Sequence, residues 1–169
     1  NAAAVPSETA ISQASDLIVA SDKPLIVAGA VGQRPGVTEI LGSIAKSFAL
    51  PVVQVGGPSL LSDHPMNLGY AAGEHLPDAD VILVIESAVP WIPRNVEPNK
   101  KAKIIHLSPD PHYSGLPYRG FEMDLAIAGE PLQSLKLIED ALISHKELRR
   151  EDISKRYSII ESLHNEHVA

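Results

Sequence analysis

The sequence contains no cysteine among its 169 residues. This absence excludes disulfides, thiolate zinc sites, iron–sulfur clusters and thiol nucleophiles. Long apolar runs are also absent, because the clearest one, Val81–Ile85, is far shorter than the roughly 20 residues that cross a bilayer. The amino terminus lacks a basic segment followed by an apolar stretch. We therefore expect a cytoplasmic protein without a membrane partner.

Positive charge is in the minority, since 14 Lys and Arg residues stand against 21 Asp and Glu residues, for a net charge of −7. Nucleic-acid surfaces need clustered Lys and Arg. The basic pair Arg149–Arg150 is followed at once by Glu151 and Asp152, so no nucleic-acid partner is expected. With 44% hydrophobic residues the chain can bury one good core.

Residues 23–48 combine a strand, a glycine-bearing turn and an amphipathic helix. Residues 24–28 (PLIVA) are an uninterrupted apolar run, typical of a strand covered on both faces. Apolar residues then recur at helical spacing over residues 37–48. Ligands of open α/β sheets bind beyond the carboxyl ends of strands, which makes the turn Gly29–Gly36 a candidate site. Its glycines do not make the G-x-G-x-x-G fingerprint, and spacing alone favours a purely conformational role.

The same patterns continue along the chain. They predict helices at 7–21, near 71–76 and from Pro131 to Leu142, and strands at 52–55, 81–85, 103–107 and 125–128. Alternating strands and helices predict an α/β fold. The expected architecture is a Rossmann-like, doubly wound, mostly parallel sheet of five or six strands with helices on both faces.

Three segments are distinguished by composition. Residues 1–4 are interpreted as a cloning remnant joined to a fragment, because no initiator Met precedes them. Residues 5–145 form the Rossmann-like domain. Residues 146–169 are highly charged, with apolar residues at helical spacing, and are expected to be a helical tail or linker that docks on a further, C-terminal domain.

Five segments follow one another in a characteristic order: KPLIVAGAVGQRPGVTEILGSIAKSFALPVVQ, LSDHPMNLGY, DADVILVIES, AKIIHLSPDP and DLAIAGEPLQSL. In this order they resemble the central domain of thiamine diphosphate-dependent enzymes of the acetolactate synthase type. The resemblance covers roughly residues 10–142. Its more specific parts are DHPMNLG and AKIIHLSPDP.

The resemblance implies a three-domain parent enzyme, a transferase or lyase that makes or breaks a carbon–carbon bond of a 2-oxo acid. Thiamine diphosphate and Mg²⁺ would be bound by the N- and C-terminal domains of the same polypeptide, and the parent would be a homo-oligomer. The GDG-type motif that holds the diphosphate is missing here. The resemblance therefore implies no catalytic residue and no metal site in this fragment, which would be an inert scaffold between domains.

Central domains of this family bind FAD in some members, ADP in a few and nothing in others. Flavin-binding relatives tend to have a Gly-Ala-Arg-Phe-like turn after the strand that matches 81–85, whereas residues 86–89 here read Glu-Ser-Ala-Val. Of two acidic positions usual after the next strand, Ser108 replaces the first and Asp110 keeps the second. A carboxylate beside a diphosphate costs electrostatic energy, so FAD is possible but disfavoured.

Residues at the turn and the strand ends would form the cleft if a nucleotide does bind. These candidates are Gly29, Gly32, Gln33, Arg34, Gly56, Glu86, Ser87, Ala88 and Asp110. Gln33 and Arg34 are the best phosphate contacts, with surface solvation as the alternative. Two other functions stay open. One is a stand-alone FAD-, NAD- or ADP-binding regulatory or redox module, and the other is a small enzyme with Glu86 and Asp110 as acid and base.

Isolated histidines and the single tryptophan offer weaker candidates. His164 and His167 could share a metal with Glu161, but a solvated helix end is favoured. Trp91 could stack a base, but an interdomain contact is favoured. Structural roles are expected for His64, in a turn, and for His106, inside a strand.

Overall fold

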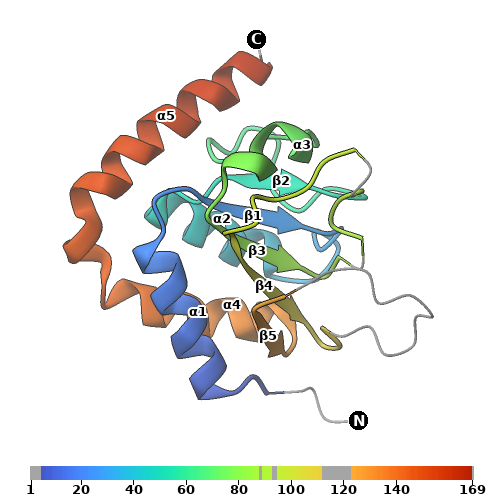
Figure 1. Ribbon diagram of the computed structural model, residues 1–169, viewed down its shortest axis with the longest axis vertical. Coiled ribbons are helices and arrows are strands. Elements are labelled where there is room, and N and C mark those ends of the chain that lie inside the picture. Colours follow the sequence, from blue (N-terminus) through green and yellow to red (C-terminus); the bar gives the residue numbers. More distant parts are fainter. Residues whose placement is uncertain (1–4, 88, 93–94, 112–122, 169) are drawn as a thin grey trace.

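A computed structural model describes residues 5–87, 89–92, 95–111 and 123–168 (Figure 1). Its centre is a five-stranded sheet with the order β2-β1-β3-β4-β5, and every neighbouring pair is parallel. The predicted Rossmann-like α/β fold is confirmed, with five strands in the sheet formed by these residues. The strands are β1 Pro24–Ala28, β2 Val52–Gln54, β3 Val81–Ile85, β4 Lys103–Ser108 and β5 Leu125–Ala128.

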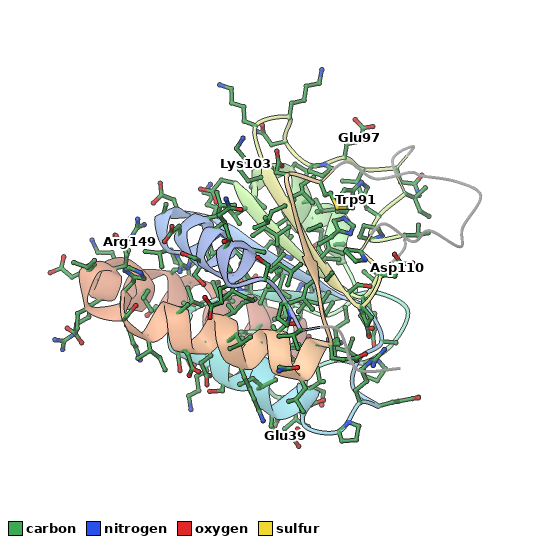
Figure 2. The ribbon with its side chains drawn as sticks, turned by 90° about the horizontal axis from the view of Figure 1, so that it is seen from below. Glu39, Trp91, Glu97, Lys103, Asp110 and Arg149 are labelled. Carbon is green, nitrogen blue, oxygen red and sulfur yellow. The ribbon has the colours of Figure 1, made fainter. Side chains whose placement is uncertain are left out.

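The helices are α1 Glu8–Ala20, α2 Val37–Phe48, α3 Ala72–His75, α4 Pro131–Ile143 and α5 Arg150–Val168, with 3₁₀ turns η1 Leu76–Asp78 and η2 Lys146–Arg149. Helix α4 contacts both α1 and α2, and Figure 2 shows these helices gathered on one side of the sheet. The chain moves in opposite directions across the sheet from β1 to β2 and from β2 to β3. Right-handed crossovers therefore place α2 and α3 on opposite faces. No helix of the described residues is both long and apolar enough to cross a membrane.

Local sequence explains where the first helix begins. The Ser7 hydroxyl accepts a hydrogen bond from the backbone N–H of Ala10 at 3.3 Å and so caps α1, as its sequence predicts. Ile11, Ala14 and Ile18 are buried on one face of α1. Burial of each large aliphatic side chain contributes about 1.5–3 kcal/mol relative to exposure.

The two central strands, β1 and β3, are buried along their whole length. Their register pairs Ile26 with Leu83 and Ala28 with Ile85. The carboxyl ends of β1 and β3 are therefore level with each other, and the residues that follow them must share one edge of the sheet.

Helix α5 packs one face on this domain, whereas the sequence led us to expect that it docks on a neighbour. Ile160 is only 5% exposed and belongs to the core, but the adjacent Ile159 is 64% exposed. Arg156 donates hydrogen bonds to the carbonyl oxygens of Phe48, at 2.7 Å, and Ala49, at 2.8 Å. The tail thus has a partner within this chain, and its approach to a further domain stays a prediction.

Candidate functional site

The ends of β1 and β3 meet at the position where the sheet changes its winding direction. The N–H of Gly29 donates to the carbonyl oxygen of Ile85 at 2.8 Å. A Cβ atom on Gly29 would lie 2.2 Å from the carbonyl oxygen of Glu86, so only glycine fits here. Glu86 itself has a φ of 45°, in the left-handed region that rarely suits a non-glycine residue. This close approach fixes the first predicted turn against the end of β3.

The turn after β1 also packs on the loop that follows β2. The N–H of Gly32 donates to the carbonyl oxygen of Pro58 at 3.1 Å, and a Cβ atom on Gly32 would lie 2.6 Å from that oxygen. The loop is held by the buried Gln54, whose Oε1 accepts from the N–H groups of Ser59, at 2.8 Å, and Leu60, at 3.0 Å. Sequence reasoning overlooked Gln54, although a polar residue at the end of an apolar strand is a usable signal.

Arg34 lies between two carboxylates. Its Nη2 is 2.6 Å from Oε1 of Glu86, and its Nη1 is 3.1 Å from Oε2 of Glu130. Glu130 is the N-cap residue of α4, so the pair of bridges joins the ends of β1 and β3 to the start of α4. Burial raises the pKa of Glu86 above its usual value, and the charge of Arg34 opposes that rise. With one guanidinium between two carboxylates, this cluster carries no surplus positive charge for a phosphate.

The other predicted cleft residues are distributed along the same edge. Gln33 is exposed, Ser87 is buried, and Ala88 lies outside the described residues. Asp110 is exposed, and its N–H donates to the Ser108 hydroxyl at 3.1 Å. Figure 2 shows Asp110 at the opposite end of β4 from Lys103. The carboxylate of Glu86 forms an ion pair with Arg34. The acid and base roles of Glu86 and Asp110 stay a prediction.

Gly56, with a φ of 77°, lines an open groove of about 630 Å³ beyond the carboxyl end of β2. Tyr70, Val89 and Ile92 also line it and are 60%, 57% and 56% exposed. Trp91 contributes to the same wall but is only 7% exposed and belongs to the core. The ring of Trp91 packs inside this domain, so little of it is available to another domain, and the interdomain contact expected for Trp91 stays a prediction. Its apolar neighbours supply the exposed surface instead.

His64 has two backbone partners. Its Nδ1 accepts from the N–H of Met66 at 3.1 Å, which places the proton on Nε2, 2.9 Å from the carbonyl oxygen of Gly42. Burial lowers the pKa of His64, and the bond to Gly42 opposes that shift only in part. These contacts fit the turn role expected for His64. His106 is 2% exposed inside β4, as its sequence context suggests.

The solvated helix end favoured for His164 and His167 is right for His167, which is exposed, and wrong for His164, which is 6% exposed. The alternative metal group with Glu161 is not among the metal-ligating groups of the described residues. His164 is buried, and its Nδ1 is 2.8 Å from the carbonyl oxygen of Asn67. His167 instead lies near Glu74 and His75 of α3. A helical repeat identifies residues on one helix, but it does not reveal which other element that helix meets.

The fold and the strand ends define a class, a Rossmann-like parallel α/β domain with its candidate cleft at the switch point between β1 and β3. Residues 11–138 match the family described as thiamine pyrophosphate enzyme, central domain. This match covers most of the sequence. The chain belongs to that family.

Solved structures with this fold include a candidate thiamin diphosphate-dependent enzyme from Mycobacterium smegmatis, at 20% identity and a TM-score of 0.66. That match covers 82% of this chain and 28% of the other. Benzoylformate decarboxylase from Polynucleobacter necessarius is 15% identical, with a TM-score of 0.62 over 84% of this chain and 28% of its own. The chain thus spans little more than a quarter of either enzyme. A search of curated proteins found no match.

Proposed function

We propose that this chain is the central domain of a longer, acetolactate synthase-like enzyme that acts on 2-oxo acids. The family match supports this, together with the fact that the matched part covers only 28% of each similar enzyme. Thiamine diphosphate, held with Mg²⁺ by N- and C-terminal domains of the same polypeptide, would supply the chemistry that makes or breaks the carbon–carbon bond. The residues present here do not fit that cofactor, because the chain has no GDG-type motif and its switch-point cluster is acidic.

The role of this domain is that of a scaffold and interdomain wall without a bound flavin. The observation that carries this proposal is the position of Arg34 between Glu86 and Glu130. Arg34 is the candidate phosphate contact, and its charge is already compensated twice. A diphosphate entering here would meet two carboxylates, which costs electrostatic energy unless a cation intervenes.

An exposed apolar surface supports the wall role. Tyr70, Val89 and Ile92 line the groove at the carboxyl edge of the sheet. Contact with another domain would remove these side chains from water, a gain of about 25 cal/mol for each Å² of apolar surface. The longer polypeptide is expected to assemble as a homo-oligomer through its other domains, which light scattering of that polypeptide would measure.

The flavin proposal is tested by calorimetric titration of the domain with FAD, ADP and NAD, after its absorbance has been checked for carried-over flavin. No micromolar binding is expected. Glu86→Gln removes one carboxylate from Arg34 and should raise any residual affinity, whereas Glu97→Gln, at an exposed glutamate in the connection after β3, should not. Micromolar binding by the unaltered domain would favour the alternative, a nucleotide-binding regulatory or redox module.

The enzymatic proposal needs the longer polypeptide. With thiamine diphosphate and Mg²⁺ it should consume a 2-oxo acid, and the isolated domain should not. If the longer polypeptide consumed none of a panel of 2-oxo acids, that result would contradict this substrate class. That result would leave the family membership of the domain untouched.

A further inference from the structure

Three metal-ligating side chains from two distant parts of the sequence meet near the end of α5. Glu74 and His75 belong to α3, and His167 lies in the last turn of α5. One ligand atom from each lies within 4.8 Å of the other two, and Nε2 of His167 is 4.0 Å from Oε2 of Glu74. Figure 1 shows α3 and the carboxyl end of α5 at the same end of the molecule.

The donor set is two imidazoles and one carboxylate. This combination suits Zn²⁺ and other first-row divalent ions, and water fills the open positions of such sites. Ligand atoms about 2.0–2.2 Å from a tetrahedral ion lie about 3.3–3.6 Å from each other. Glu74 and His167 are exposed, so their side chains have room to rotate toward a common ion.

His75 has an unused nitrogen. Its Nε2 is buried and has no hydrogen-bond partner among the described residues. A buried polar atom without a partner is uncommon in folded proteins and calls for an explanation. The ring interacts electrostatically with two carboxylates, those of Glu74 and Asp78, as well as with the ring of His167, and negative charge around a histidine favours a cation at that place.

The approach of α5 to α3 is fixed by contacts outside the cluster. One turn before His167, the ring of His164 lies 2.8 Å from the carbonyl oxygen of Asn67. Leu163 packs on the core from the same helix. His167 therefore faces α3 from a helix that is already docked. Ion binding would not have to offset the full entropy loss of ordering this end of α5.

We propose that Glu74, His75 and His167 form a binding site for one divalent transition-metal ion of the zinc class, which clamps the carboxyl end of α5 to α3. The site lies at the amino ends of neighbouring strands, where η1 leads into β3, and so is separate from the switch-point cluster. It does not depend on the activity of the longer enzyme.

The test is calorimetric titration of the 169-residue chain, freed of any histidine tag, with ZnCl₂, followed by Co²⁺ absorption to report the coordination geometry. One Zn²⁺ should bind per chain. His167→Ala should weaken the affinity at least about tenfold, because even outer-shell changes at metal sites cost 10–100-fold. Glu166→Gln, an exposed neighbour outside the cluster, and His145→Ala, in the connection between α4 and α5, should leave it unchanged.

Thermal melting supplies a second readout. Saturating Zn²⁺ should raise the melting temperature of the unaltered chain and of Glu166→Gln, but not that of His167→Ala. Because His167 is on the surface, His167→Ala should fold, and its melting without zinc should match that of the unaltered chain. Absence of Zn²⁺ binding, or equal binding by His167→Ala and Glu166→Gln, would overturn the proposal.

Discussion

Arg156 joins α5 to the ends of two earlier helices, and its removal offers a sharp test of how this domain is held together. Its guanidinium donates to the carbonyl oxygens of Phe48, the last residue of α2, and Ala49, the C-cap of α2, at 2.7 and 2.8 Å. It also reaches the carbonyl oxygen of Ser21, the C-cap of α1, at 3.4 Å. The last carbonyls of a helix have no partner within the helix, and they carry the negative end of its dipole.

The expected loss follows from these bonds. A hydrogen bond to a charged group contributes about 1.5–3 kcal/mol, and Arg156 makes two of good geometry. Water can reach part of the exposed helix end in the variant, and a methionine keeps some of the packing. We therefore expect Arg156→Met to lower the free energy of unfolding by about 2–4 kcal/mol. For a domain of this size that corresponds to a fall in melting temperature of roughly 5–15 °C.

Urea denaturation and calorimetry of the domain measure this change. Lys155→Met is the matched control, because it makes the same kind of substitution at the adjacent, exposed position of α5. A surface change of that kind should alter stability by no more than about 0.5 kcal/mol. If the two variants unfolded at the same urea concentration, the reasoning that Arg156 caps two helices would be refuted.

Further predictions concern three buried or partly buried positions. Gly29→Ala should lower the free energy of unfolding, measured by urea denaturation, by about 1–3 kcal/mol or more, because its new methyl would lie 2.2 Å from the Glu86 carbonyl oxygen. Unchanged stability would show that the strand ends can separate. Burial raises the pKa of Asp80, but hydrogen bonds from the Ser21 hydroxyl and two backbone N–H groups outweigh it and hold that pKa below the ordinary 3.8. The stability that ionised Asp80 contributes is thus present above pH 3.8 and lost as pH falls through its folded pKa. Asp80→Asn should therefore make the free energy of unfolding, measured by urea denaturation, depend less on pH in the acid range. The pKa of His64 is held below its ordinary 6.5, mainly by burial. The stability that neutral His64 contributes is therefore present above pH 6.5 and lost as pH falls through its folded pKa. His64→Gln should reduce this dependence of stability on pH, measured as urea midpoints at several pH values.

Much of the fold is predicted by the sequence because its signals are local. The run Val81–Ile85 is apolar at every position, and so short an apolar run is typical of a strand covered on both faces. Ser7 stands before an apolar helical repeat and caps α1 as expected. Serial order then identified the family, which the match over residues 11–138 confirms.

The site was only partly predictable. The positions of Gly29 and Arg34 after a strand placed them at the sheet edge, but the sequence could not reveal that Arg34 pairs with Glu130, 96 residues away. Long-range pairs depend on which strands become neighbours, and that choice is made by packing of the whole sheet.

The sequence by itself determined the secondary structure, the parallel α/β class and the family. Apolar periodicity and helix caps depend on residues that are close in sequence, and the order of the segments follows directly from the chain. Only the tertiary structure decided which groups meet. It placed Arg34 between two carboxylates, Trp91 inside the core, and His167 beside α3 rather than with Glu161. The physical reason is that charge pairing and burial act across space, between residues such as Arg34 and Glu86 or Arg34 and Glu130, which the chain separates by 52 and 96 positions.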